Sequence, residues 1–257
     1  MHDNSSLVEA RIRRFVRERL EPALYAHSQE LTLAAWVVPG EPVPFAEAIG
    51  QTYAPFTVGS PWGRAWSTMW LRVTGTIPTT GAGQRPELVF DLGFHGAQPG
   101  FQAEGTVYRV DGSIVKAVEP RNAYVPLDGA PGDPIELYLE AAANPDVGDG
   151  FRDFRPTPLG EWDSAGDEPL YELRRADVAV LDLTVWNLLQ DFSVLDGLRA
   201  ELPESSSRRA EILRALERAV DATDPDDVAG TAADARAALA EVLQRPASAS
   251  AHAAHAV

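Results

Sequence analysis

The sequence predicts a mainly β fold, an antiparallel sandwich, with helical segments at both ends of the chain. Short runs of alternating apolar and polar residues occupy its middle part, where glycine and proline also become frequent. The first and last parts show helical periodicity instead. Several short strands separated by Gly/Pro turns are typical of a sandwich, and 257 residues suffice for one large or two small domains.

The first segment is predicted to form a helical arm over residues 7–21. Leu7, Phe15 and Leu20 fall broadly on one side of this helix, and five arginines occupy the rest of its surface. Pro22 discourages the helix from continuing. The arm is therefore expected to pack its apolar side on the body of the protein.

The middle of the chain shows the two-residue period of half-buried strands. From 69 to 77, apolar residues such as Leu71 and Val73 alternate with others. The residues Asp111, Gly112 and Ser113 separate two further runs and predict a hairpin turn. Other strands are expected at 87–92, 135–141 and 178–182, and function is expected in the long loops 39–66 and 143–169.

Helical spacing returns after the last expected strand. Ser207 is predicted to cap one helix, while Asp224 is predicted to cap another that has Pro225 at its first position. Pro246 stops that helix. The expected organisation is an arm at 1–28, a β-sandwich at 29–183, a helical linker segment at 184–245 and a tail at 246–257.

Charge and composition exclude several classes of protein. The 22 basic and 38 acidic residues give a net charge of −16, which repels nucleic-acid phosphates and anionic lipid. The chain has no cysteine, so disulfides, thiolate metal sites and cysteine nucleophiles are ruled out. No apolar run is long enough to span a membrane, and the first residues lack the apolar core of a leader peptide. We therefore expect no nucleic-acid partner, no membrane partner and a cytoplasmic location.

Few residues form a pattern that carries chemistry. The nucleophile-elbow, P-loop and dinucleotide-binding motifs are all missing from the sequence. His252 and His255 have HxxH spacing, but a metal site needs three or four ligands. Asp146, Asp149 and Asp153 could offer oxygen ligands to calcium, although their spacing is not that of an EF-hand loop and a solvated acidic face is the simpler interpretation.

Three tryptophans are the most informative cluster. Trp62, Trp66 and Trp70 are spaced by four residues, but Pro61 and Gly63 favour a loop that enters a strand over a helix. Indole faces stack on the apolar faces of sugar rings, and the indole N–H can donate to hydroxyls. Sugar contact and core packing at the edge of the sandwich are the two interpretations.

These tryptophans lie in PWGRAWSTMWLRVTGTIP, which resembles the W-G-x-x-W-x-T-x-W-F/L-x-V-x-x-x-I-P segment of glycoside hydrolase family 38 α-mannosidases of the cytosolic or vacuolar class. The similarity runs in order from about Leu7 to Val257, and other blocks that agree include DLGFHGAQPGFQAEGTVYRVDGSIVKAV, RNAYVPL and ELYLEAAANP. The resemblance implies a galactose-binding-like jelly roll that helices join to a catalytic barrel.

In that family, the segment similar to SASAHAAHAV leads into a G-H-A-H-I-D-x-x-W motif that holds a catalytic metal, usually zinc. The chain stops at Val257, before such a motif, and its own HxxH does not match H-x-H-x-D. The resemblance therefore implies the N-terminal domain of an α-mannosidase, truncated just before the catalytic domain. We expect no cofactor, catalytic residue or metal ligand in this chain, which should be inactive alone, and zinc or a similar divalent metal in the missing domain.

Three functions follow as hypotheses. The first is a structural and assembly domain that supports the downstream catalytic domain and takes part in a homo-oligomer. The second is a carbohydrate-binding module for mannose-containing glycans, whose site residues would be Trp62, Trp66, His95, Asn122 and Trp162. The third, an independent hydrolase, is disfavoured because retaining glycoside hydrolysis needs a nucleophilic carboxylate, and this family adds a metal.

Overall fold

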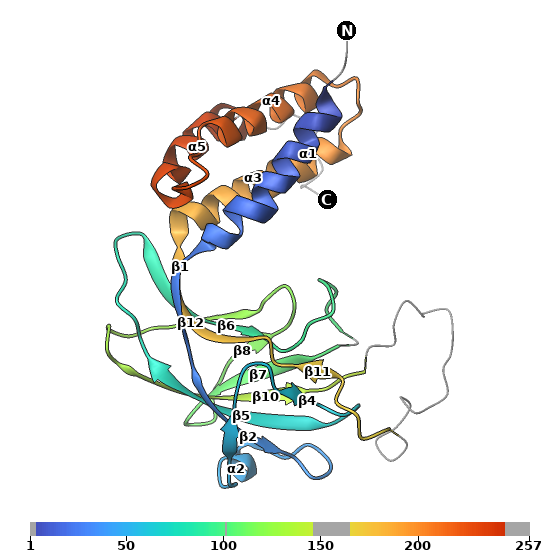
Figure 1. Cartoon of the computed structure of the whole chain (residues 1–257), viewed down its shortest axis with the longest axis vertical. Helices are drawn as coiled ribbons and strands as arrows, with labels where there is room; N and C mark the ends of the chain where they lie inside the picture. Colours follow the sequence, from blue (N-terminus) through green and yellow to red (C-terminus); the bar gives the residue numbers. More distant parts are fainter. Residues whose placement is uncertain (1–3, 101, 146–164, 245–257) are drawn as a thin grey trace, which may run out of the picture. The chain divides into compact units, whose positions relative to one another are not determined.

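The computed structural model describes residues 4–100, 102–145 and 165–244. The chain divides into two compact units (Figure 1). The helical unit contains Met1–Ala26, Ala82–Gln84 and Leu181–Val257, and the sandwich unit contains His27–Gly81 and Arg85–Val180. Each unit has a hydrophobic core of its own.

The sandwich unit is built from antiparallel sheets. A six-stranded sheet has the order β3-β2-β5-β10-β7-β8, a four-stranded sheet has the order β1-β12-β6-β9, and β4 pairs with β11. The central pair joins β5 to β10 in a register that places Leu71 opposite Leu139. The strands are β1 (Tyr25–Glu30), β2 (Thr32–Val37), β3 (Ala54–Phe56), β4 (Pro61–Trp62), β5 (Thr68–Thr76), β6 (Gln84–Asp91), β7 (Glu104–Arg109), β8 (Ile114–Val118), β9 (Tyr124–Pro126), β10 (Pro134–Ala142), β11 (Tyr171–Glu172) and β12 (Arg175–Asp182).

The alternation in sequence becomes the inner face of these strands. Leu71 on β5, Phe90 on β6 and Leu139 on β10 are fully buried in one cluster. The predicted hairpin is confirmed: β7 and β8 pair across a turn in which Gly112 has φ +84°, a value that favours glycine. The Asp111 carboxylate accepts the Ser113 N–H at 2.9 Å, and hydrogen bonding from the Ser113 side chain together with this backbone bond lowers the pKa of Asp111.

The outer side of β5 holds a second apolar cluster that the alternation did not indicate. Trp70 is fully buried there, although its neighbour Arg72 on the same face is exposed. The short helix α2 (Phe45–Ala48) supplies Phe45, whose ring lies 6.0 Å from that of Trp70 and 5.3 Å from that of Tyr108. Trp70 is therefore a core residue of an aromatic cluster, whose members include Trp36, Val38, Phe45, Tyr53, Trp70, Tyr108 and Tyr138.

Two tyrosines of this aromatic cluster should ionise late. Burial raises the pKa of Tyr53 to about 12, and burial together with a hydrogen bond to Glu140 raises that of Tyr108 to about 12. The folded chain then keeps these protons between pH 10 and 12, where the unfolded chain has lost them, so stability should fall as the pH rises through that window.

Tyrosinate absorbance during an alkaline titration measures this effect. We expect tyrosinate from Tyr53 and Tyr108 to form near pH 12, and the variant Tyr108→Phe to lose one of these late-titrating groups. An unchanged absorbance near pH 12 in Tyr108→Phe would contradict the prediction.

The helical unit packs four long helices around one core. Ile12 and Phe15 of α1 meet α3 there, with the rings of Phe15 and Phe192 5.7 Å apart. Hydrogen bonds from arginines connect the helices, such as Arg208 to the carbonyl of Val242 at 2.7 Å. The elements are α1 (Ser5–Phe15), a π-helical turn (Val16–Leu20), a 3₁₀ turn (Pro22–Leu24), α3 (Leu183–Glu201), α4 (Ser207–Asp221) and α5 (Val228–Leu243).

Details of these helices differ from the sequence predictions. Leu7 is 69% exposed instead of buried, and Val8 packs against the core in its place. The residue that caps α4 is Ser206, whose hydroxyl accepts the Arg209 N–H. Asp227 caps α5, because Asp224 is engaged in a turn before the helix. None of the helices in the described parts of the chain is long and apolar enough to cross a membrane.

Candidate functional site

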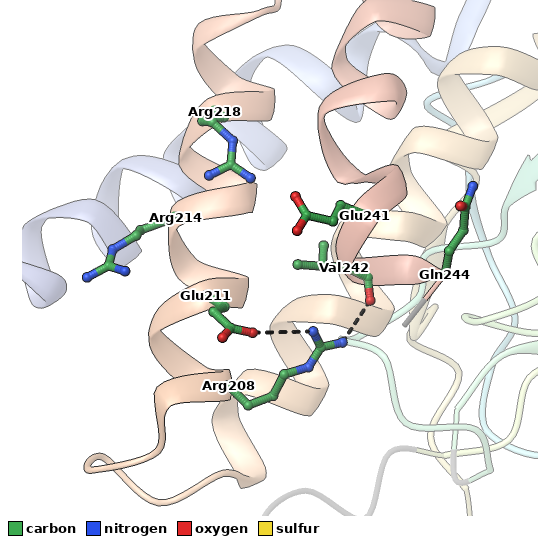
Figure 2. Close-up of a pocket in the computed structure, with 7 residues that line it drawn as sticks. All are labelled: Arg208, Glu211, Arg214, Arg218, Glu241, Val242 and Gln244. Carbon is green, nitrogen blue, oxygen red and sulfur yellow. Dashed lines mark hydrogen bonds and ion pairs between the residues drawn. The ribbon is translucent and has the colours of Figure 1, made fainter. Parts of the chain in front are cut away.

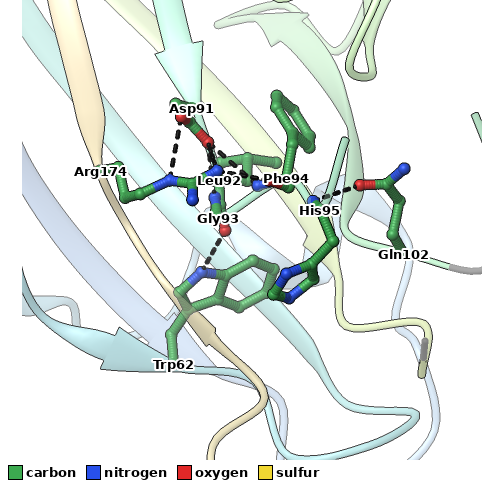
Figure 3. Close-up of polar contacts among 8 residues, drawn as sticks. All are labelled: Trp62, Asp91, Leu92, Gly93, Phe94, His95, Gln102 and Arg174. Atoms are coloured by element: carbon green, nitrogen blue, oxygen red, sulfur yellow. Dashed lines mark hydrogen bonds and ion pairs between the residues drawn. The ribbon is translucent and has the colours of Figure 1, made fainter. Parts of the chain in front are cut away.

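The predicted site residue His95 lies in a loop that follows β6 and is organised by Asp91. The Asp91 carboxylate accepts the backbone N–H groups of Gly93 and Phe94 at 2.9 and 3.0 Å. Arg174 holds the same carboxylate with two bonds of 3.0 Å and also donates to the carbonyl of Phe94 (Figure 3). The loop is thus fixed by a bidentate ion pair at its base.

Three aromatic rings with tilted planes pack in a row at this loop. The rings of Trp62 and Tyr171 lie 5.4 Å apart, and the rings of Tyr171 and His95 lie at the same separation of 5.4 Å. Trp62 is only 4% exposed, and its indole N–H donates to the carbonyl of Leu92 at 2.9 Å (Figure 3). His95 is exposed at the end of this row. Tyr171 therefore lies between the two predicted residues Trp62 and His95 and contacts both.

The amide side chains of Gln102 and Asn144 form further hydrogen bonds that hold the loop. Gln102 is buried, and its side-chain oxygen accepts the His95 backbone N–H at 2.8 Å while its amide nitrogen donates to the carbonyl of Gln98. Asn144 donates to the carbonyl of Gln102 at 3.2 Å and accepts the Tyr171 hydroxyl on its own carbonyl. This network holds the His95 backbone through Gln102 and links Gln102 to Tyr171 through Asn144.

The remaining predicted residues have different settings. Trp66 is 40% exposed and has φ +69°, a conformation that is strained for a bulky side chain. Asn122 is exposed and donates to the Glu119 carboxylate, and its neighbour Arg121 donates to the carbonyl of Ala97 at 2.8 Å. Trp162 lies outside the described residues.

Sequence reasoning did not identify the residues that build this loop, which are Asp91, Gln102, Asn144, Tyr171 and Arg174. Asp91 could have been found from its position two residues before Gly93, since aspartate often accepts the N–H two residues on. The partners Arg174 and Tyr171 are about 80 residues away in sequence and leave no local signal.

The chemistry of this loop is that of positioning. Asp91 is committed to two backbone N–H groups and a guanidinium, so it is not placed as a general acid or base. No group of three or more histidine, aspartate and glutamate side chains could hold a metal among the residues that the structure describes. His252, His255 and the acidic residues Asp146, Asp149 and Asp153 lie outside those residues. Of the predicted site residues, His95 is the one that lies in this loop, and it is exposed.

Substitution of Gly93 by alanine should disrupt this loop. Gly93 has φ +100°, and a Cβ atom there would lie 2.8 Å from the carbonyl oxygen of Glu172. We expect a loss of at least about 2 kcal/mol, from strain and from the backbone clash. The matched control is Gly96→Ala, where φ is +78° but nothing lies within 4 Å of the added Cβ, so only about 1 kcal/mol of strain is expected. Urea unfolding of both variants measures the difference, and equal losses would refute the clash.

Two hollows elsewhere on the surface are weaker candidates for a functional site. One of about 490 Å³ lies between α4 and α5 and is lined mainly by charged side chains (Figure 2). Arg208 in it already pairs with Glu211 at 3.7 Å. Another hollow of about 250 Å³ opens into the apolar interior of the sandwich beside Ile77, Val125 and Ile135. Neither hollow contains a constellation of residues for covalent or acid–base chemistry.

The fold and this loop define an antiparallel jelly roll module. The polar side chains described around the loop form hydrogen bonds to backbone groups. The family model described as "Alpha-mannosidase, jelly roll domain" matches residues 28–179. The chain therefore belongs to the family of α-mannosidase jelly roll domains. This result confirms the predicted family resemblance and the predicted β-sandwich with helices on either side.

Two curated relatives extend this similarity. "Alpha-mannosidase 2C1" of Mus musculus is 30% identical over 216 residues, which are 80% of this chain and 19% of the relative. The Homo sapiens protein of the same name is 30% identical over 200 residues, 75% of this chain and 17% of the relative. The chain thus spans less than a fifth of the length of these relatives. Among solved structures, a β-glucuronidase from Ruminococcus gnavus has a TM-score of 0.36 and 15% identity over 61% of this chain and 30% of that one, a likeness too weak to bear on function.

Proposed function

We propose that this chain is a non-catalytic structural and assembly domain of an α-mannosidase, which supports a catalytic part located elsewhere in the same enzyme. The observation that carries the proposal is the match of residues 28–179 to the α-mannosidase jelly roll domain. The similar α-mannosidases are more than five times as long as the part that matches this chain. The commitment of Asp91 to its loop supports a non-catalytic role. This proposal also includes zinc in the catalytic part and a cytoplasmic location. It divides the chain into an arm at 1–28, a sandwich at 29–183, a helical segment at 184–245 and a tail at 246–257.

Co-expression tests this role directly. The chain and the catalytic part of the enzyme would be produced as separate polypeptides, alone and together, and assayed for co-purification and for cleavage of an aryl α-mannoside. We expect a complex, with activity that requires or is strongly raised by both parts. Independent behaviour of the two polypeptides would refute the assembly role. Hydrolysis by this chain alone, with or without added zinc or cobalt, would establish the rival function of an independent hydrolase.

A second function, binding of mannose-containing glycans, is favoured by the conformation of Trp66. A non-glycine residue at φ +69° costs free energy of about 1–3 kcal/mol, and such strain tends to occur at functional positions. The indole is 40% exposed and has a face suited to a sugar ring. Of the other residues proposed for this site, His95 and Asn122 are exposed, whereas Trp62 is buried beneath Tyr171 and would support the site from below.

The glycan hypothesis predicts loss of binding from one substitution. Trp66→Gly relieves the positive φ at this position but also removes an indole that is more than half buried, so urea unfolding would first establish that the variant is folded. The change should abolish any response to mannose oligosaccharides in a titration followed by tryptophan fluorescence and NMR. The wild-type chain is the reference, and no response to millimolar sugar in the wild type would refute sugar binding.

A further inference from the structure

Helix α3 carries apolar residues on two opposite sides, and its charged residues Asp191, Asp196 and Arg199 are held in ion pairs. Val185, Leu188 and Phe192 are buried in the core of the helical unit, yet the opposite side carries Trp186, Val194 and Leu198 at 40%, 63% and 42% exposure. A helix that is apolar on two opposite sides is normally buried on both. By contrast, the outward side of α4 carries the exposed arginines Arg214 and Arg218, as expected for a solvated helix (Figure 2).

From Trp186 to Leu198 the exposed residues of α3 carry no charge, and the exposed Glu201 follows on the same side at the end of the helix. We call this surface the α3 face; its exposed residues are Trp186, Gln190, Ser193, Val194, Gly197 and Leu198. In a chain with 23% charged residues, such a stretch is unusual for solvent-exposed helix. Apolar and uncharged residues with an aromatic anchor are typical of the core of a protein interface.

Gly197 adds an independent observation at the centre of this surface. It lies inside α3, where glycine is a poor helix former, and a Cβ atom placed on it would meet nothing within 4 Å. The fold of this chain therefore does not require a glycine at this position. A glycine on the outside of a helix permits close approach of another backbone, which supplies a reason for it if a partner packs there.

We propose that the α3 face is the surface by which this domain docks onto the catalytic part of its α-mannosidase, a proposal that rests on the assembly role proposed above. The similarity to mouse "Alpha-mannosidase 2C1" covers 80% of the chain, more than the jelly roll at 28–179, so part of the chain outside the jelly roll is also shared. About four-fifths of that relative lies outside the match and provides the occupant. A second copy of this chain is disfavoured as the occupant because each copy carries a net charge of −16.

The test uses the co-expressed chain and catalytic part, with variants Val194→Glu and Leu198→Glu. Each places a charge in the proposed interface, and we expect recovery of the complex to fall by about tenfold or more. Leu7→Glu is the matched control, because Leu7 is 69% exposed on α1 of the same unit, and this variant should form the complex as the wild type does. Gly197→Ala should raise the thermal midpoint of the isolated chain while weakening the complex, a combination that a purely structural role for the glycine would not produce.

The outcomes separate the two proposals. Loss of the complex in the α3-face variants with a normal Leu7→Glu complex supports docking through α3. A wild-type complex that is unaffected by all α3-face variants overturns the α3 face and leaves the assembly role standing, whereas absence of any wild-type complex overturns both. A concentration-dependent dimer of the chain alone that Val194→Glu abolishes would assign the face to a second copy and overturn the proposed occupant. If the glutamate variants fail to fold, the Gly197→Ala result decides.

Discussion

Replacement of Glu9 by alanine is expected to cost the helical unit about 3 kcal/mol of unfolding free energy. Glu9 on α1 accepts from Arg199 of α3 at 2.5 Å and from Arg209 of α4 at 3.2 Å. The Arg199 side chain is only 6% exposed, so its charge cannot regain water when Glu9 is removed. The loss should lie at the low end of the range for buried pairs, because Asp196 still holds Arg199 at 2.8 Å.

The matched control for Glu9 is Asp221→Ala in the same unit. Asp221 pairs with Arg11 at 2.7 Å, but the two side chains are 58% and 43% exposed. Exposed pairs contribute less than about 1 kcal/mol. Hydrogen exchange measured by mass spectrometry distinguishes the two units: Glu9→Ala should deprotect α1, α3 and α4 and leave the sandwich strands unchanged. Equal losses from the two substitutions would show that the buried network contributes no more to stability than the exposed pair.

Replacement of Trp70 by alanine should destabilise the sandwich unit by about 3–5 kcal/mol. Trp70 is fully buried, and it lies on the outer side of β5 instead of in the inner core. The rings of Phe45 and Tyr108 lie 6.0 and 5.3 Å from its ring. Its removal leaves a cavity under α2 and exposes apolar rings. Loss of hydrogen-exchange protection in β5 and β10, with the helical unit unchanged, is the expected result.

Two further substitutions test the cause of that loss. The indole N–H of Trp70 is buried without a hydrogen-bond partner in the described structure. Trp70→Phe should therefore cost clearly less than Trp70→Ala, since it leaves a smaller cavity and removes an unpaired donor. Val37→Ala, at a 59% exposed position on β2, should cost less than about 0.5 kcal/mol. If Trp70→Phe proved as damaging as Trp70→Ala, ring packing would not be the source of the stability.

The repeating local patterns were predictable from the sequence. The alternation at 69–77 and the turn at Gly112 indicated β5 and the β7–β8 hairpin, because side-chain direction in strands has a period of two and positive φ favours glycine. Helix caps were predicted within one residue for α4 and within three for α5. Several candidate caps lie together at these helix ends, and only the packed geometry selects one of them.

The candidate site was predictable only in part. His95 could be named because it stands in a glycine-rich loop, but the sequence gives no sign that its ring packs against Tyr171, which the β4–β11 pairing places opposite Trp62. Trp66 is exposed and Trp62 is buried on either side of a turn with positive φ at Gly63 and at Trp66, and a positive φ at a tryptophan is not expected from residue type. Aromatic spacing alone could not say which indole faces solvent.

The sequence by itself determined the class of fold, the division of the chain into helical ends and a strand-rich middle, and the family resemblance, because these depend on short-range periodicity and on motifs that can be compared directly. The tertiary structure alone decided that Trp70 is buried, that Glu9 joins Arg199 and Arg209, and that α3 leaves Trp186, Val194 and Leu198 uncovered. Those contacts join residues up to 200 positions apart in the chain. Burial and pairing over such separations are set by the packing of whole elements, which leaves no trace in the residues near either partner.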